Sequence, residues 1–199
     1  MAVLCILLGY LLGSLSASIL LSRFLFHSDI RTKGSGNAGA ANAARVFGMG
    51  AGALTFACDF AKTILSMWLG RLLFAELGAV LAGFGCLIGH CAPLYFHFRG
   101  GKAVSSTAAV ALFLDWRLFV AALIAYVLGA VLSKKASVSS LCGAVAIGVS
   151  ALLLLDDPWK KALAVFAVLL VFFMHRSNIR RLLNGTEPNF SPGKQEKKD

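Results

Sequence analysis

Charged residues are scarce in this chain. They make up 14% of its 199 residues, whereas 58% are hydrophobic. A soluble domain would carry about 25% charged residues. The composition therefore excludes an ordinary soluble domain and indicates an integral membrane protein, in agreement with a mean hydropathy of +0.79.

Lys and Arg are absent from the first 22 positions. Because a cleavable signal peptide begins with a positively charged region, we interpret the first apolar run as a retained membrane span. The sequence also lacks any CxxC pair. Small buried side chains, rather than a disulfide framework or a zinc site, are therefore predicted for the five cysteines, Cys5, Cys58, Cys86, Cys91 and Cys142.

Several familiar signatures are missing as well. The chain has no GxxxxGK[ST] loop, no HExxH or HxxxxD pattern, and no Ser/His/Asp set at a recognisable spacing. The net charge is +10, but no basic strip with interleaved aromatics favours nucleic acid. We expect no metal, no cofactor and no nucleic-acid partner. Membrane lipids and phosphorylated substrates are the expected partners.

Long apolar runs are what the chain has instead. They predict an all-α, polytopic membrane protein with seven transmembrane helices, although a perpendicular span needs about 20 residues and several runs are shorter. The 103–115 run is the shortest, and a longer or partly re-entrant segment is the alternative there. Residues 1–183 would form the membrane domain and 184–199 a polar, flexible cytoplasmic tail. The predicted spans are 3–24, 50–74, 76–92, 103–115, 118–133, 138–155 and 159–175.

The distribution of basic residues predicts the orientation. Most of the 19 Lys and Arg residues fall in the connections that seven spans would place on one side, together with the C-terminus. The opposite ends hold only Arg71, Arg117, Lys160 and Lys161. Since basic loops remain cytoplasmic, the N-terminus is predicted outside and the C-terminus inside. Nearly every residue able to do chemistry would then face the cytoplasm.

The first polar cluster on that side runs from Gly34 to Arg45 and contains glycines and two asparagines. Ser35 or Asn37 is expected to cap a following helix, whose N-terminus favours an anion. Asn42 would share a helix face with Arg45, which can grip a phosphate. A small-residue packing segment is the alternative, but it does not explain the asparagines and the arginine.

The second cluster runs from Gly89 to Lys102. Free backbone N–H groups at Gly100 and Gly101 are expected to hold phosphate oxygens or to polarise a carbonyl, and Lys102 adds a positive charge. The alternative is that Arg99 and Lys102 only fix the orientation in the membrane. His90 would more often be a hydrogen-bonded residue at a helix end than a catalyst.

The third cluster begins at His175. A helix would bring His175 and Asn178 to one face, where the imidazole can move a proton or bind phosphate. Ser140, near the start of another span, can hydrogen-bond a substrate oxygen. Asp59 and Lys62 lie inside a span at i and i+3, and we expect them to pair and to play a structural role.

These three clusters resemble the motifs of the bacterial acyl-phosphate:glycerol-3-phosphate acyltransferases. Gly34-Ser35-Gly36-Asn37, with Gly39, Asn42 and Arg45, resembles the first motif. The resemblance to the second motif lies in Gly89-His90, Pro93 and Phe98-Arg99-Gly100-Gly101-Lys102. The resemblance to the third motif lies in His175, Asn178-Ile179, Arg181-Leu182 and Gly185-Thr186-Glu187. Motif order and spacing are kept to about residue 190.

The resemblance implies a seven-span enzyme of phospholipid synthesis in the bacterial inner membrane, with its active site facing the cytoplasm. It would transfer an acyl group from acyl phosphate to the sn-1 hydroxyl of glycerol 3-phosphate, which gives lysophosphatidic acid and inorganic phosphate. The implied catalytic residues are Ser35, Arg45, Lys102, His175 and Asn178. The implied substrate-binding residues are Gly34, Gly36, Asn37, Gly39, Asn42, His90, Gly100, Gly101 and Ser140.

The chain departs from the family pattern at Ala41, Ala92, Ala103 and Met174. Ala41 stands where threonine is usual, which removes one phosphate donor. A transporter or channel for a phosphorylated anion is the competing interpretation. It predicts polar residues through the membrane depth and an outside gate, whereas the outside turns here are very short.

Overall fold

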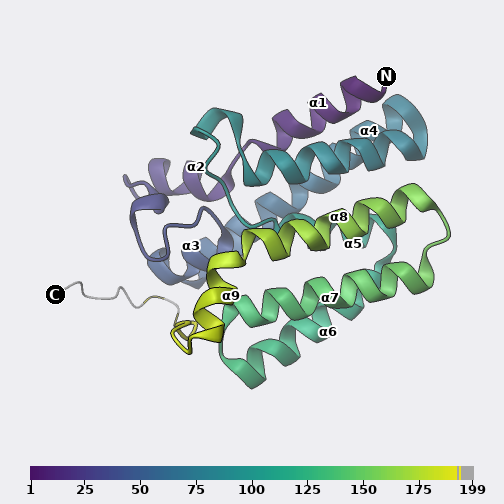
Figure 1. The fold of residues 1–199 in the computed structure, drawn as a ribbon. Helices are drawn as coiled ribbons and strands as arrows, with labels where there is room; N and C mark the ends of the chain where they lie inside the picture. The colour runs from purple at the N-terminus through teal and green to yellow at the C-terminus, as the bar shows by residue number, and fades with distance from the viewer. Residues whose placement is uncertain (192, 194–199) are drawn as a thin grey trace.

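The computed structural model describes residues 1–191 and 193. Within these residues the chain is all-helical and has no strand. Two short 3-10 helices, η1 (Ile30–Thr32) and η2 (Leu94–Phe96), lie in the connections. The α-helices are α1 (Ala2–Gly13), α2 (Ala17–Phe24), α3 (Ala40–Phe47), α4 (Met49–Cys91), α5 (Val104–Leu114), α6 (Trp116–Ser133), α7 (Ala136–Leu154), α8 (Pro158–Met174) and α9 (Arg176–Leu183) (Figure 1).

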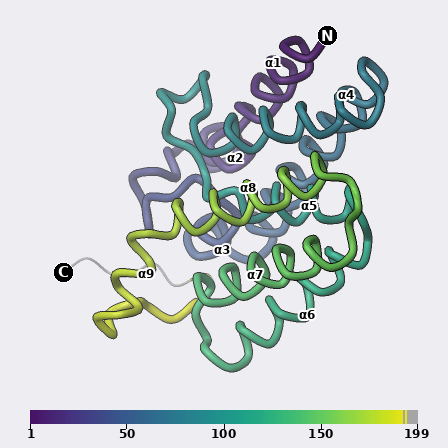
Figure 2. Tube along the Cα trace, turned by 45° about the vertical axis from the view of Figure 1, so that its right-hand side comes forward, coloured from purple at the N-terminus to yellow at the C-terminus, as the bar shows by residue number. Residues whose placement is uncertain are grey.

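The long helices form a bundle. α1 packs along α4, and α6 packs along α7 at the other side of the molecule. α5 and α8 lie between these two pairs, as the ribbon and the turned Cα tube both show (Figures 1 and 2). The core between them is made of aliphatic side chains such as Leu87, Val110, Leu163 and Val171, all fully buried.

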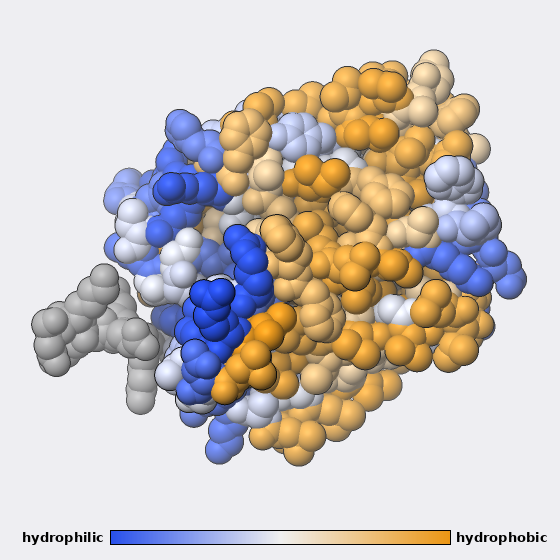
Figure 3. Space-filling model, viewed as in Figure 1, coloured by the Kyte–Doolittle hydropathy of each residue, from blue (hydrophilic) through white to orange (hydrophobic). Residues whose placement is uncertain are grey.

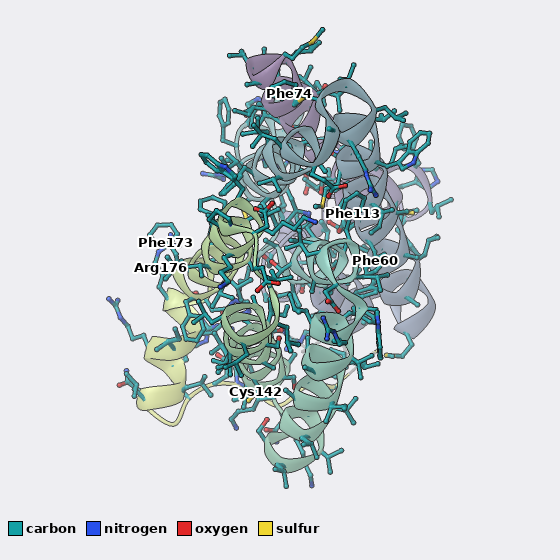
Figure 4. All side chains as sticks on the ribbon, turned by 90° about the vertical axis from the view of Figure 1, so that its right-hand side faces the viewer. Phe60, Phe74, Phe113, Cys142, Phe173 and Arg176 are labelled. Atoms are coloured by element: carbon teal, nitrogen blue, oxygen red, sulfur yellow. The ribbon has the colours of Figure 1, made fainter. Side chains whose placement is uncertain are left out.

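Helix α4 is folded back on itself. Phe74 and Ala75 have non-helical φ/ψ angles, and this break divides the helix into two antiparallel halves. The halves meet so closely at Gly70 and Gly78 that a Cβ on either residue would collide with the carbonyl oxygen of the other. The two predicted runs 50–74 and 76–92 correspond to these halves. Figure 4 labels Phe74 at the turn.

Among the described residues, four helical segments are long and apolar enough to cross a membrane, or five if the bent pair α8 and α9 counts as one span. α5 has only 11 residues, so it rises about 16 Å and is too short for a perpendicular span. The structure thus has the apolar helices of an integral membrane protein.

The predicted span 3–24 coincides with an apolar segment, Ala2–Phe24, that is long enough to cross a membrane, but this segment is not one continuous helix. It breaks after Gly13, and α2 begins only at Ala17. At the break, the Ser14 hydroxyl donates to the Tyr10 carbonyl and accepts from the Leu94 N–H. The freed carbonyl of Leu15 accepts a hydrogen bond of 2.6 Å from Lys62. Polar partners on α4 and η2 therefore replace the missing helical bonds.

Polar and apolar residues are separated on the surface. Hydrophilic residues gather at the end of the bundle that carries α2, α3 and α9, and most of the remaining visible surface is hydrophobic (Figure 3). At the opposite end, Glu76 pairs with Arg71 at 2.6 Å and with Lys160 at 3.1 Å. The turn within α4 and the start of α8 therefore lie together, away from the larger polar end.

Candidate active site

One cavity of about 590 Å³ lies at the polar end of the bundle and extends between the helices. Eleven of the fourteen residues predicted as catalytic or substrate-binding line it. Three do not: Gly36, Gly100 and Gly101. The lining set is Gly34, Ser35, Asn37, Gly39, Asn42, Arg45, His90, Lys102, Ser140, His175 and Asn178.

The loop before α3 is held in shape by Asn42. Its side-chain oxygen accepts from the Ser35 N–H at 2.9 Å, and its amide donates to the carbonyls of Ile30 and Lys33. Gly34 and Gly36 have φ angles of +55° and +72°, a region that favours glycine. This buried side chain thus fixes the loop that presents Ser35 to the cavity.

The predicted side-chain cap of α3 is wrong. The N-cap residue is Gly39, and neither Ser35 nor Asn37 caps the helix. The chain reaches α3 with Gly39 in an extended conformation, and the Ser35 N–H is bound to Asn42 instead. Both side chains still line the cavity.

Arg45 and Lys102 give the polar end of the cavity its positive charge. Arg45 comes from α3, and Lys102 from the connection between α4 and α5. Within residues 1–191 and 193, neither forms an ion pair with a carboxylate. Two cations without a carboxylate counter-ion in a partly buried cavity are suited to bind a phosphate dianion.

Lys102 sits in a setting that disfavours its charge. Burial lowers its pKa, the nearby guanidinium of Arg181 lowers it further, and Glu187 partly offsets both, so that the pKa falls to about 8. The ammonium donates a hydrogen bond to the side-chain oxygen of Asn178. A bound anion would restore the preference for the charged form.

Asn178 is oriented in turn by Glu187. The Asn178 amide donates to the Glu187 carboxylate at 2.6 Å, and Ser137 and Arg181 donate to the same carboxylate at 2.6 and 2.7 Å. Burial raises the pKa of Glu187, but these three hydrogen bonds outweigh it and hold the pKa below its usual value. Glu187 therefore remains ionised and fixes the Asn178 amide with its oxygen toward Lys102.

Glu187 was not among the predicted site residues, although it belongs to the third motif. The segment that carries it begins the predicted tail 184–199. Glu187 is 8% exposed, and the Phe190 N–H donates to the Lys134 carbonyl at 2.8 Å. The Gly193 N–H donates to Ala44 on α3. This stretch therefore crosses from the start of α7 toward α3 beside the cavity, and the rest of the predicted tail, residues 192 and 194–199, lies outside the described residues.

His175 stands at the junction of α8 and α9, which meet at an angle of 57°. Phe173 and Arg176 lie on the outer side of this junction, with the guanidinium 4.7 Å from the ring centroid (Figure 4). The Nδ1 atom of His175 is 2.8 Å from the Val171 carbonyl. Since a carbonyl only accepts, Nδ1 carries a proton, and Nε2 is the ring atom available to a substrate.

The expectation of free N–H groups at Gly100 and Gly101 is wrong. The Gly100 N–H donates to the Cys91 carbonyl at 3.1 Å and the Gly101 N–H to the His90 carbonyl at 3.0 Å. These bonds fold the connection back onto the end of α4. The two glycines therefore set the course of the backbone that leads to Lys102, and they do not face the cavity.

The far part of the cavity is apolar. Phe56 on α4, Phe119 and Leu123 on α6, and Ala144 and Ile147 on α7 line it. Ser140 lies at its polar side, where its hydroxyl also donates to the Ala136 carbonyl at 2.8 Å. A single cavity therefore combines a cationic end with an apolar end, which matches an amphiphilic ligand with a phosphate head.

Comparisons with known proteins agree with this geometry. The model of the family described as glycerol-3-phosphate acyltransferase matches residues 3–185. A glycerol-3-phosphate acyltransferase of Finegoldia magna is 35% identical over 89% of this chain and 90% of its own length. One of Carboxydothermus hydrogenoformans is 36% identical over 94% and 95%.

The fold has a counterpart among solved structures. The crystal structure of PlsY, an integral membrane glycerol 3-phosphate acyltransferase in its glycerol 3-phosphate form, matches with a TM-score of 0.90. The match covers 96% of each chain at 26% sequence identity. Fold, sequence and the cationic cavity agree: this chain belongs to the glycerol-3-phosphate acyltransferase family.

Proposed function

We propose that this chain acylates glycerol 3-phosphate with an acyl phosphate as the donor. The product would be lysophosphatidic acid acylated at the sn-1 hydroxyl, together with inorganic phosphate. The observation that carries the proposal is the continuous cavity whose cationic end holds Arg45 and Lys102 and whose apolar end is lined by Phe56, Phe119 and Leu123. Membership of the family supports the acceptor.

The reaction needs little covalent assistance from the protein. The sn-1 hydroxyl oxygen attacks the acyl carbonyl carbon, a C–O ester bond forms, and the bond from that carbon to the phosphate oxygen breaks. The hydroxyl proton leaves with the departing phosphate, whose oxygen can accept it. Because phosphate is a good leaving group, positioning and neutralisation of charge would supply most of the rate enhancement.

The residues that line the polar end have the chemistry for this task. Arg45 and Lys102 would neutralise phosphate oxygens, and Ser35, Ser140 and Asn178 would add hydrogen bonds. His175 would present Nε2 to a phosphate or hydroxyl, because its Nδ1 is bound to the Val171 carbonyl. Asn42, Gly34, Gly36, Asn37 and Gly39 would shape the first loop, and His90, Gly100 and Gly101 the second.

We further propose seven spans in the bacterial inner membrane, with residues 1–183 as the membrane domain and 184–199 as a cytoplasmic tail. The N-terminus would be outside, and the cavity would face the cytoplasm. The polar end of the bundle, with most of the cationic connections, supports this orientation (Figure 3). Reporter fusions at the two termini would test it: a cytoplasmic N-terminus or an external C-terminus would refute the topology.

The transporter or channel for a phosphorylated anion is the weaker alternative. The end of the bundle opposite the cavity carries short turns with paired charges, such as Arg71 with Glu76 and Arg117 with Asp115. Short turns with paired charges do not favour a second polar vestibule for a permeating anion.

The choice of donor is testable with purified protein. Palmitoyl phosphate, palmitoyl coenzyme A and palmitoyl carrier protein would each be supplied with glycerol 3-phosphate, and the lysophosphatidic acid formed would be measured by mass spectrometry. We expect product only from palmitoyl phosphate, with the acyl chain at sn-1. Product from a thioester at an equal or higher rate would contradict the proposed donor.

A further inference from the structure

A buried polar pair joins His90, a predicted substrate-binding residue that lines the cavity, to Asp59, which was predicted to have only a structural role. Asp59 on the first half of α4 is 1% exposed, and His90 at the end of the second half is 5% exposed. His90 Nδ1 is 3.6 Å from Asp59 Oδ1. Placing a carboxylate in a membrane helix costs free energy, so a charged group there usually pairs with another polar group or serves a function.

The ion pair with Lys62 accounts for only part of the environment of Asp59. The Lys62 ammonium is 2.8 Å from Asp59 Oδ1, as expected for the i and i+3 pair, and also donates to the Leu15 carbonyl. This pair ties the break between α1 and α2 to α4. It does not explain why an imidazole faces the same carboxylate oxygen from the other half of the folded helix.

The other side of the imidazole contacts the glycine turn. His90 Nε2 occupies the space that a Cβ on Gly101 would need, and the Ala38 carbonyl oxygen would be 2.8 Å from the same Cβ. The His90 carbonyl also accepts the Gly101 N–H at 3.0 Å. The ring of His90 is therefore packed between Asp59 and the backbone that leads directly to Lys102.

We propose that Asp59 is a positioning residue. Its carboxylate holds the His90 imidazole against Gly101 and so fixes the turn that directs Lys102 at the phosphate of glycerol 3-phosphate. The inference rests on the proposed function for its kinetic consequence, but its structural part is independent. A carboxylate that orients an imidazole through Nδ1 leaves Nε2 directed at the turn. In the absence of substrate, the distance between two such groups is often longer than in the substrate complex.

The kinetic test compares Asp59→Asn with Ser66→Ala, a buried polar residue of the same helix that does not line the cavity. We expect Asp59→Asn to raise KM for glycerol 3-phosphate about 10-fold, with kcat and KM for palmitoyl phosphate within about 3-fold. Ser66→Ala should leave all three constants within about 2-fold. An unchanged KM for glycerol 3-phosphate in folded Asp59→Asn would overturn the proposal.

A double variant separates positioning through His90 from a general effect of a lost charge. If Asp59 acts through the imidazole, Asp59→Asn/His90→Ala should have the same KM as His90→Ala alone. Effects that multiply would contradict the proposal. Lys62→Gln provides the matched comparison: it should lower thermal stability while KM stays within about 2-fold, and a KM rise equal to that of Asp59→Asn would assign the role to the Asp59–Lys62 pair instead.

Two measurements need no substrate and no activity. Hydrogen exchange over residues 98–103 should be faster in Asp59→Asn than in Ser66→Ala, because the imidazole that packs against Gly101 is no longer held in place. In the wild-type protein, nitrogen NMR of labelled histidines, assigned with His90→Ala, should show His90 protonated at Nδ1. Unchanged exchange in folded Asp59→Asn would overturn the proposal. A proton on Nε2 alone in the wild-type protein would also overturn it, even if Asp59→Asn failed to fold. A wild-type protein that does not acylate glycerol 3-phosphate would instead refute only the proposed function.

Discussion

Glu187 accepts a hydrogen bond of 2.6 Å from the Asn178 amide, and the oxygen of that same amide accepts from Lys102. The carboxylate thereby determines which end of Asn178 faces the cation. A segment that follows the last helix thus controls the geometry of a cluster whose other members come from α9 and from the connection between α4 and α5.

Replacing Glu187 by Gln would let the Asn178 amide turn, because the glutamine amide can donate as well as accept. A hydrogen bond to a charged group contributes about 1.5–3 kcal/mol, so we expect kcat/KM to fall roughly 10- to 100-fold. The measurement is the initial rate of lysophosphatidic acid formation. Glu76→Gln at the opposite end of the bundle is the control. Equal losses in both variants would contradict the role of Glu187.

The pH profile should report the lysine of the cavity. Lys102 is charged below its pKa of about 8 and neutral above it, so phosphate binding by the free enzyme should weaken as the pH rises through 8. We expect kcat/KM to decline above that pH. In Lys102→Arg the guanidinium stays charged, and the decline near pH 8 should disappear even if the rate is lower. A decline that persists in this variant would assign the titration to another group.

The apolar end of the cavity should contribute to binding of the acyl chain. Leu123 is half-exposed on α6, so Leu123→Ala should leave the fold intact while removing up to about 2 kcal/mol of apolar contact. KM for palmitoyl phosphate should rise several-fold and KM for glycerol 3-phosphate should not change. Leu153→Ala on α7, which does not line the cavity, is the matched control. A rise in KM for glycerol 3-phosphate alone would mean that the acyl chain does not bind at this end of the cavity.

The fold-back of α4 depends on two glycines. A Cβ at Gly78 would collide with the Gly70 carbonyl oxygen, so Gly78→Ala should lower the free energy of unfolding by about 1–3 kcal/mol. A Cβ at Gly50, on the same helix, would meet nothing within 4 Å. Gly50→Ala should therefore be neutral or stabilising, by up to about 1 kcal/mol. Thermal unfolding in detergent compares the two, and equal Tm values would refute the close packing.

Sequence patterning anticipated the bundle and most of the cavity for a physical reason. Apolar runs must lie together in a membrane, and the basic connections between them collect at one end. Arg45, Lys102 and Asn178, far apart in the chain, were therefore expected to be close, and all three line the cavity. The helical periodicity around Asp59 likewise anticipated its pairing with Lys62.

Details that depend on contacts between distant segments were not predictable in this way. The N–H groups of Gly100 and Gly101 are taken up by the end of α4, which no local pattern indicates. Asn42 was expected to lie on one helix face with Arg45 at the anion site, but its side chain forms its hydrogen bonds with the loop 30–35. The orientation of Asn178 by Glu187 requires a turn after α9 that composition alone describes only as polar.

The most direct test of the account is lysophosphatidic acid formation by the purified protein from palmitoyl phosphate, with phosphate release measured in the same sample. Wild type and Lys161→Ala, a lysine at the opposite end of the bundle, should both release phosphate and form product only when glycerol 3-phosphate is present. Lys102→Ala should do neither at a detectable rate. Equal product formation in Lys102→Ala, or no product from well-folded wild type, would contradict the account.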